Sequence, residues 1–273
     1  MDDLRDKVAV VTGGGSGIGR GMALAFAEAG MKIALVDVEK GTAEGVADEL
    51  RARGVEAEGF ETDVMDREAV RALAAKVYDR FGAVHVLCNN AGVTTLGPLH
   101  EATDADWDWV LGVNLNGVVN GLQAFLPRMK DQAGQKHVVN TASIAGMQGL
   151  PILGPYVASK FAVVGLTETL RLEGAAWGLS ASVLCPGNVN TGIVRSHRNR
   201  PAGLGTESRD PGLDASVQSA IAGGIDPEAV GRMVLAAVLR DDLYVFTHAS
   251  QRADLARRFD RILAAFDALG EAR

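Results

Sequence analysis

The fold is decided by residues 7–19, which read KVAVVTGGGSGIG. Residues 7–12 are β-branched and almost wholly apolar, which is typical of a strand buried on both faces of a parallel sheet. Glycines follow at once, and from Ile18 to Gly30 alanine, leucine and phenylalanine recur at helical spacing. A buried strand, a glycine-rich turn and a helix in this order predict a place for the phosphates of a dinucleotide, although such a turn can also serve packing alone.

The same alternation of short apolar runs and helical stretches continues along the chain. Further strands are predicted at about 32–37, 56–62, 84–89, 137–143, 181–185 and 243–246. Helices are predicted at about 42–53, 67–81, 104–130, 156–177 and 228–240, the third of them interrupted near Gly117. Strands that alternate with helices favour a parallel sheet with right-handed crossovers. The sequence therefore predicts an α/β fold, a Rossmann-type doubly wound sheet of about seven strands in the order 3-2-1-4-5-6-7.

No linker or repeat interrupts this pattern, so residues 1–273 are predicted to form a single domain. The least regular stretch, about 187–224, is rich in Gly, Pro, Arg and Ser and follows a strand, which predicts a functional loop beside the substrate. A final helix is expected at about 250–268. It places one apolar stripe on one face, made of Leu255, Phe259, Ile262, Leu263 and Phe266. We expect this stripe to dock on the core, with a subunit contact or a cap over the substrate as alternatives.

Composition excludes several classes of function. Lys and Arg number 27 against 34 Asp and Glu, and the net charge of −7 argues against nucleic acid as a partner. Cys88 and Cys185 each lie in an apolar run and predict buried thiols; no metal-ligand pattern is visible. The charged N-terminal residues argue against a signal peptide, and the absence of long apolar runs argues against a membrane span. A cytoplasmic protein is therefore expected.

The glycine-rich turn and the residue that ends the second predicted strand suggest which cofactor binds. Glycine permits a tight turn, a close approach of the backbone to a pyrophosphate and close packing of helix on strand, while the helix N-terminus attracts phosphate. The residues predicted to act in this way are Gly13, Ser16, Gly17, Ile18 and Gly19. Asp37 can accept hydrogen bonds from ribose hydroxyls and would repel a 2′-phosphate. With no obvious cation nearby, NAD is favoured over NADP, unless Asp37 is merely solvated.

The spacing Thr-Gly-x-x-x-Gly-x-Gly from Thr12 onward resembles that of the short-chain dehydrogenase/reductase family, and the resemblance extends from Lys7 to about Phe246. Asp63-Val64 resembles the family's adenine-contacting pair, and Asn89-Asn90-Ala91-Gly92 its Asn-Asn-Ala-Gly signature. Pro186-Gly187 and the residues after it resemble the segment that holds the nicotinamide amide. The further cofactor contacts that the resemblance implies are Asp63, Val64, Asn90, Ala91, Gly92, Tyr156, Lys160, Pro186, Gly187, Val189 and Thr191.

The pair Tyr156 and Lys160 matches the family's Tyr-x-x-x-Lys and shares one helix face at i and i+4. A free tyrosine has a pKa of about 10, and a nearby ammonium lowers it. Tyr156 can then exchange a proton with an alcohol or a ketone. The resemblance gives Lys160 a second role, a hydrogen bond to the nicotinamide ribose. Taken alone, the pair also fits an ordinary amphipathic helix with an exposed lysine.

Two further side chains complete the predicted catalytic set. Ser143, at the end of a predicted strand, is expected to donate a hydrogen bond to the substrate oxygen, with Thr141 the weaker competitor. Asn114 resembles the family's helix asparagine, which supports a water that joins Lys160 to solvent. Asn116 is its rival.

The substrate pocket is expected to be lined by Thr94 to Leu96, by residues after Ser143 and by those after Pro186. The apolar residues Ile144, Met147, Leu150, Ile152 and Leu153 indicate a hydrophobic substrate or simply a packed loop, and Gln148 and Asn188 could add polar contacts. A basic cluster of Arg195, His197, Arg198 and Arg200 fits either a substrate anion or a solvated loop. Residues 107–117 and 200–206 are similar to those of dehydrogenases that oxidise benzylic alcohols of aryl ethers. Alicyclic and steroid-like alcohols are the alternative substrates.

These features predict an oxidoreductase that transfers a hydride between NAD(H) and a hydrophobic secondary alcohol or ketone. The alternatives are an NADP-dependent carbonyl reductase and a protein that senses NAD without turnover. The family resemblance also implies a homo-oligomer, a tetramer or a dimer, built on the two long predicted helices at 104–130 and 156–177.

Overall fold

The computed structural model describes residues 1, 3–39, 41–205 and 211–270. Its sheet has seven strands in the order β3-β2-β1-β4-β5-β6-β7, all paired in parallel, which confirms the predicted fold class. The strands are β1 (Val8–Thr12), β2 (Lys32–Asp37), β3 (Ala57–Glu61), β4 (Val86–Asn89), β5 (Lys136–Thr141), β6 (Leu179–Cys185) and β7 (Tyr244–Phe246).

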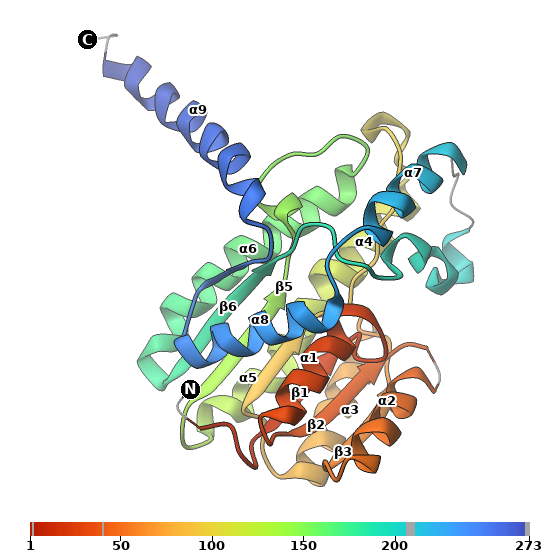
Figure 1. The fold of residues 1–273 in the computed structure, drawn as a ribbon, viewed down its shortest axis with the longest axis vertical. Coiled ribbons are helices and arrows are strands. Elements are labelled where there is room, and N and C mark those ends of the chain that lie inside the picture. The colour runs from red at the N-terminus through yellow and green to blue at the C-terminus, as the bar shows by residue number, and fades with distance from the viewer. Residues whose placement is uncertain (2, 40, 206–210, 271–273) are drawn as a thin grey trace.

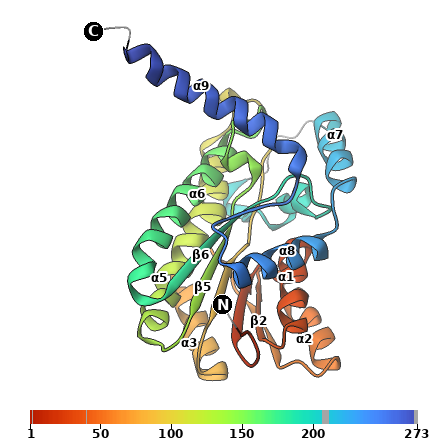
Figure 2. The same ribbon diagram turned by 60° about the vertical axis from the view of Figure 1, so that its left-hand side comes forward.

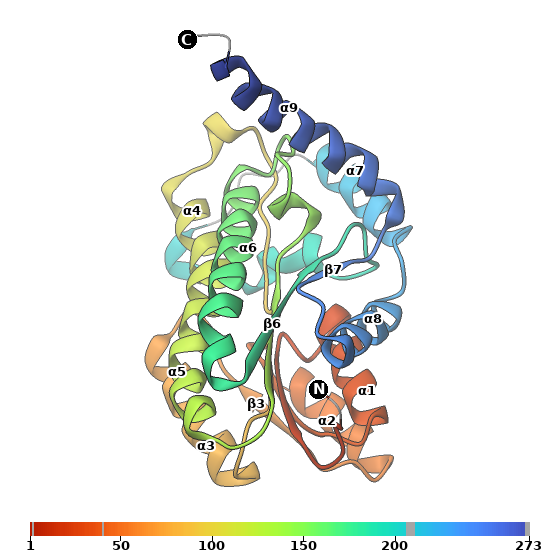
Figure 3. The same ribbon diagram turned by 90° about the vertical axis from the view of Figure 1, so that its left-hand side faces the viewer.

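Helices cover both faces of this sheet (Figure 3). One face carries α1 (Gly17–Glu28), α2 (Thr42–Ala52) and α8 (Pro227–Arg240), and the other α3 (Arg67–Phe81), α5 (Gly117–Asp131) and α6 (Gly154–Gly174). Alternate residues of β1 serve the two layers: Ala9 and Val11 pack with α1 and α8, and Val10 packs with α3 and α5. Burial on both faces explains why the strand has no polar alternation.

The long helix expected at 104–130 is present with a change of winding near its middle. It consists of α4 (Asp104–Leu111), a π-helical turn (Gly112–Asn116) and α5, so the chain does not break at Gly117. A Cβ at Gly112 would lie 2.5 Å from Met65 Cε, and one at Gly117 would lie 2.7 Å from Val64 Cγ2. The two glycines therefore let the helix pass close to the segment after β3.

The stretch expected to be irregular, about 187–224, contains a helix. Two 3-10 segments (Ile193–Asn199 and Ala202–Leu204) precede α7 (Pro211–Ala222), which stands beside the carboxyl end of the sheet (Figure 1). Proline is tolerated at the first position of a helix, so the Pro211 that suggested a loop instead begins α7. Thr206, part of the stretch similar to benzylic-alcohol dehydrogenases, lies outside the described residues.

The C-terminal helix α9 (Arg252–Gly270) leaves the body of the molecule (Figures 1 and 2). Leu255 packs against the core, but Phe259, Leu263 and Phe266 are 44%, 59% and 66% exposed. The expectation that the stripe docks on the core of its own chain is therefore wrong beyond the first turn. The helix continues past the point where the body can cover it.

The prediction that both cysteines are buried is confirmed. Cys88 on β4 and Cys185 at the end of β6 are free thiols, both fully buried. Among the described residues no three His, Cys, Asp or Glu side chains gather as metal ligands. No helix in the described part of the chain is long and apolar enough to cross a membrane.

The contact between α1 and α8 depends on glycine, because a Cβ at Gly231 would lie 2.1 Å from the carbonyl oxygen of Gly21. We expect Gly231→Ala to lower the free energy of unfolding by about 1–3 kcal/mol or more, since the helices must separate. Gly45→Ala, at an exposed position of α2 where a Cβ meets nothing within 4 Å, is the matched control and should raise the free energy of unfolding by up to ~1 kcal/mol. Urea unfolding measures both, and equal effects would contradict this view of the contact.

Candidate active site

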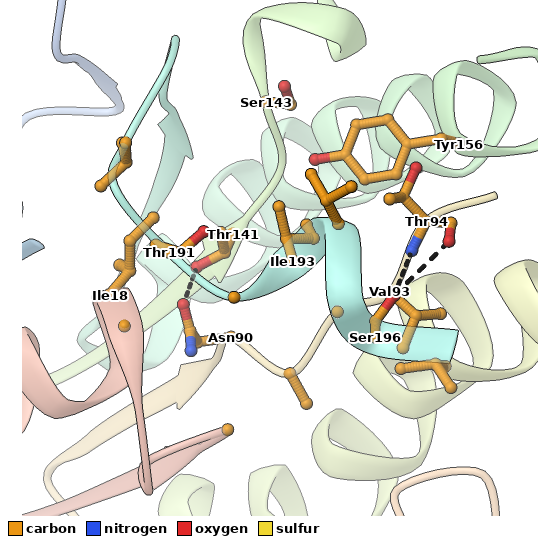
Figure 4. Close-up of a pocket in the computed structure, with 18 of the residues that line it drawn as sticks. Ile18, Asn90, Val93, Thr94, Thr141, Ser143, Tyr156, Thr191, Ile193 and Ser196 are labelled. Atoms are coloured by element: carbon orange, nitrogen blue, oxygen red, sulfur yellow. Dashed lines mark hydrogen bonds between the residues drawn. The ribbon is translucent and has the colours of Figure 1, made fainter. Parts of the chain in front are cut away.

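A cavity of about 430 Å³ opens at the carboxyl ends of β1, β2, β4, β5 and β6 (Figure 4). Ligands bind at this edge in open α/β sheets. Most of the predicted site residues line it. They are Gly13, Ser16, Gly17, Ile18, Asp37, Asp63, Val64, Asn90, Ala91, Gly92, Ser143, Tyr156, Lys160, Pro186, Gly187, Val189 and Thr191. The fold therefore brings the predicted cofactor and catalytic residues to one continuous wall.

Gly19 and Asn114 are the two predicted site residues that do not line the cavity. A Cβ at Gly19 would lie 2.0 Å from the carbonyl oxygen of Gly13 and 2.7 Å from Asn90 Nδ2. Gly19 thus shapes the turn by allowing α1 to pack closely on it, which is the packing role of glycine in such turns.

The glycine-rich turn fits a phosphate group. Gly13 and Gly17 have φ of +63° and +50°, values that L side chains rarely adopt. Ser16 is the N-cap of α1, and its side chain makes no capping hydrogen bond. The first N–H groups of α1 therefore stay available as hydrogen-bond donors, and the positive end of the helix dipole lies at the cavity.

Asp37 is fixed at the end of β2 beside this turn. Its Oδ2 accepts a hydrogen bond from the Gly15 N–H at 3.1 Å and its Oδ1 accepts one from the Glu39 N–H at 3.0 Å. Each carboxylate oxygen can accept a further bond. This arrangement fits the hydroxyls of an adenosine ribose whose phosphates lie on the turn.

Asn90 braces the carboxyl ends of three strands. Thr12 Oγ1 accepts from the N–H groups of Asn90 and Ala91 at 2.8 and 3.1 Å, and Asn90 Nδ2 donates to the Thr12 carbonyl at 3.0 Å. Thr141 Oγ1 donates to Asn90 Oδ1 at 3.1 Å (Figure 4). The Thr141 hydroxyl is thus occupied in the brace, which leaves Ser143 as the better-placed hydroxyl for a substrate.

Ser143 lies two residues beyond the end of β5, where it caps a 3-10 turn (Ile144–Gly146), and is not in the strand as predicted. Its Oγ accepts from the Ala145 N–H at 3.1 Å and donates to the Pro186 carbonyl at 3.5 Å, a long bond that a substrate oxygen can replace. Its hydroxyl and that of Tyr156, which stands on the first turn of α6, both face the cavity (Figure 4).

Lys160 is buried one helical turn after Tyr156. Its Nζ donates to the Thr141 carbonyl at 2.8 Å and lies 5.4 Å from the centre of the Tyr156 ring. Burial lowers the pKa of Lys160 to about 8. Burial also raises the pKa of Tyr156, while a hydrogen bond with Ser143 acts to lower it. The lowering of the Tyr156 pKa by the lysine that the sequence predicted is therefore not found in the folded chain, where burial raises this pKa and favours the protonated form.

Asn114 is fully buried within the π-helical turn. Its Oδ1 accepts from the Val93 N–H at 2.8 Å, and its Nδ2 donates to the Val93 carbonyl and to Ser159 Oγ at 3.0 and 3.1 Å. A Cβ at Gly92 would lie 3.5 Å from Asn114 Oδ1 and 3.6 Å from Lys160 Nζ, so both atoms border the same small space. Its rival Asn116 is exposed, and π turns recur at functional sites.

The far wall of the cavity is apolar. Of the residues expected at the substrate, Thr94, Leu96, Ile144, Leu150, Leu153 and Asn188 line the cavity, whereas Thr95, Met147, Gln148 and Ile152 do not. The sequence did not identify Val217, Ala220 and Ile221, which α7 adds to the lining. Their i, i+3, i+4 spacing marks one face of a helix and could have revealed them.

The basic cluster does not form a single anion site. Arg200 is 5% exposed in its side chain, pairs with Asp106 at 2.6 Å and lies over the Trp109 ring at 5.4 Å. Arg198 instead pairs with Glu39, at the other side of the cavity. Both arginines anchor the segment after β6, so the interpretation of a solvated loop is wrong for Arg200.

Comparison with known proteins decides the family. A family model described as short chain dehydrogenase matches residues 7–202, which include the glycine-rich turn and the Tyr156/Lys160 pair. The chain belongs to the short-chain dehydrogenase family.

Relatives of this short-chain dehydrogenase match it over nearly its whole length. It is 38% identical to a C alpha-dehydrogenase of Sphingobium sp. over 96% of this chain and 87% of that protein. It is 34% identical to a 1-deoxy-11-beta-hydroxypentalenate dehydrogenase of Streptomyces exfoliatus over 95% and 89%. A short-chain dehydrogenase/reductase from Burkholderia phymatum, solved in complex with NAD, superposes with a TM-score of 0.93 at 40% identity and covers 97% of both chains.

The buried Lys160 predicts a pH dependence of stability. In the unfolded chain this amine keeps its proton to about pH 10.5, but in the folded chain it loses it near pH 8, so raising the pH between these values favours the folded chain. From pH 8 to 9.5 we expect the free energy of unfolding of the wild type to rise, relative to that of Lys160→Met, by roughly 1–2 kcal/mol.

Urea unfolding at the two pH values measures this difference. Lys76→Met, on the exposed side of α3, controls for the loss of a surface charge. Parallel pH curves for the wild type and Lys160→Met would show that Lys160 is not desolvated as described.

Proposed function

We propose that this protein transfers a hydride between NAD(H) and a hydrophobic secondary alcohol or ketone, with Tyr156 as the general acid and base. One observation carries the proposal: Ser143, Tyr156 and Lys160 line the same cavity as the glycine-rich turn and Asp37. A dinucleotide with its adenosine ribose at Asp37 and its phosphates at the glycine-rich turn would bring its nicotinamide ring to the Tyr156 hydroxyl at the other end of the cavity.

Each catalytic side chain has a separate task in this proposal. Tyr156 Oη takes the proton from the alcohol during oxidation and returns it during reduction. Ser143 Oγ donates a hydrogen bond to the substrate oxygen and stabilises the charge that develops there. Bound NAD would supply the hydride acceptor and a positive charge. Lys160 Nζ would bond the nicotinamide ribose, and Asn114 would support a water-linked path from Lys160 to solvent.

The preference for NAD over NADP is supported by the fixed carboxylate of Asp37, which repels a 2′-phosphate. The Burkholderia phymatum relative was solved with NAD. The cofactor contacts proposed are Gly13, Ser16, Gly17, Ile18, Asp37, Asp63, Val64, Asn90, Ala91, Gly92, Tyr156, Lys160, Pro186, Gly187, Val189 and Thr191. An NADP-dependent reductase and an NAD sensor without turnover are the competing functions.

The proposed substrate is an uncharged, bulky secondary alcohol. Leu96, Leu153 and Ile221 line the far wall, and no cation of the described part of the chain lines the cavity except Lys160 and the Glu39-paired Arg198. An anionic substrate would therefore find no partner there. The similarity of residues 107–117 and 200–206 favours a benzylic alcohol, and the name of the Streptomyces relative, a hydroxypentalenate dehydrogenase, favours an alicyclic hydroxyl.

Removal of the Tyr156 hydroxyl separates catalysis from binding. We expect Tyr156→Phe to lose about 10²–10⁴-fold in turnover, because the proton acceptor is gone, while NADH affinity by fluorescence stays within about threefold. Tyr244→Phe is the matched control, since Tyr244 lies on β7 and bonds Glu168 outside the cavity. Turnover of Tyr156→Phe near the wild-type level would contradict the proposed role.

We propose further that the chain acts in the cytoplasm and self-associates as a dimer or tetramer, without nucleic acid or membrane as a partner. The apolar residues of α9 recur at alternating steps of four and three, the repeat of helices that pair with one another. They are Leu255, Phe259, Ile262, Phe266 and Leu269. Exposed stripes of this kind mark protein interfaces.

In this proposal the exposed stripe of α9 makes one interface of the oligomer, in addition to the interface expected at the helices 104–130 and 156–177. Phe259→Ser/Phe266→Ser should reduce the molar mass measured by light scattering to a smaller multiple of the chain, because the paired apolar surface is lost. Asp260→Ser, on the polar face of the same helix, should leave it unchanged. An unaltered mass in the double variant would exclude α9 from the interface.

A further inference from the structure

Two segments distant in sequence meet at the end of the cavity marked by Asp37. Glu39 follows β2, and Arg198 and Asn199 end the 3-10 segment Ile193–Asn199. Asn199 Nδ2 donates to Glu39 Oε1 at 2.9 Å, and the Arg198 guanidinium pairs with the same oxygen. These two hydrogen bonds, that of Asn199 foremost, lower the pKa of the Glu39 carboxyl.

The segment that carries Arg198 is also held by hydrogen bonds of Ser196 and Arg200, two residues before and after it. Ser196 Oγ accepts from the Thr94 N–H at 3.1 Å (Figure 4), and Arg200 is held by Asp106. Residues 193–200, the strap, therefore cross the cavity from the Thr94 side to the Glu39 side. The bonds to Glu39 hold the strap beside Asp37, two residues before Glu39 in the sequence.

The charges at this end of the cavity are unequal. Asp37, Glu39 and Asp63 line it with three carboxylates, and Arg198 is the cation that the described chain places among them. Arg198 stays 44% exposed in its side chain, so it is held by its partner and not by burial. A guanidinium in this place would suit a phosphate as well as it suits a carboxylate.

We infer that Glu39 determines cofactor choice together with Asp37, because it holds Arg198 and Asn199 in a latch over the adenosine ribose and keeps Arg198 from a 2′-phosphate. The inference rests on the proposed function. Glu39 acts on the nucleotide through Arg198 and is thus a positioning residue. Removing the charge of Glu39 should free Arg198 for the extra phosphate of NADPH while the contacts proposed for NADH persist.

Nucleotide affinity measured on the whole chain tests this inference. Glu39→Gln keeps an acceptor for Asn199 Nδ2 and removes the charge. By fluorescence titration we expect the Kd for NADPH to fall about tenfold and the Kd for NADH to stay within about threefold. The gain should vanish in Glu39→Gln/Arg198→Gln and shrink in 0.5 M salt, since the contact is exposed.

Glu44→Gln is the matched control, because Glu44 pairs with Arg51 on α2 outside the cavity and its loss changes the net charge equally. It should leave both affinities unchanged. The inference is overturned if the Kd for NADPH is unchanged in Glu39→Gln, or if the gain in NADPH affinity persists in Glu39→Gln/Arg198→Gln. In either case NADH binding by the wild type would leave the proposed function standing. Failure of the wild type to bind either nucleotide overturns both.

Discussion

The brace at Asn90 is the interaction on which the rest of the site depends. It joins the ends of β1, β4 and β5 through Thr12 and Thr141, and it lies against the turn that begins at Gly13. Lys160 bonds the carbonyl of Thr141, so the same network reaches the base of the proposed catalytic set. Hydrogen bonds among buried and partly buried groups are costly to break, so this network holds the ends of the three strands together before any ligand binds.

Burial differs between the Tyr156 end and the Asp37 end of the cavity, and the charges that each end favours differ with it. At the Tyr156 end, desolvation lowers the pKa of Lys160 and raises that of Tyr156, so charge on either group is disfavoured until a partner arrives. At the Asp37 end the carboxylates stay partly exposed to solvent, and two backbone N–H groups hold that of Asp37. A dinucleotide with a cationic ring at one end and ribose hydroxyls at the other matches this division.

Much of this could be predicted from local sequence. β1 could be predicted because burial on both faces leaves a continuous apolar run, and the Tyr156/Lys160 pair because four residues make one helical turn. The latch could not be predicted, because Glu39 and Arg198 lie 159 residues apart. The exposure of α9 could not be predicted, because the sequence of an apolar stripe is the same whether the helix packs on its own core or on another surface. Ser143 was assigned to a strand because the capping turn after β5 is itself apolar.

We propose that one cavity holds NAD and a hydrophobic alcohol for hydride transfer. Absorbance at 340 nm tests this proposal most directly, with benzylic, alicyclic and steroidal secondary alcohols as substrates and with NAD and NADP in parallel. We expect NADH formation on at least one of these classes, at a rate with NAD well above that with NADP. Firm NADH binding without turnover of any alcohol in the panel would contradict it and favour a sensor of NAD.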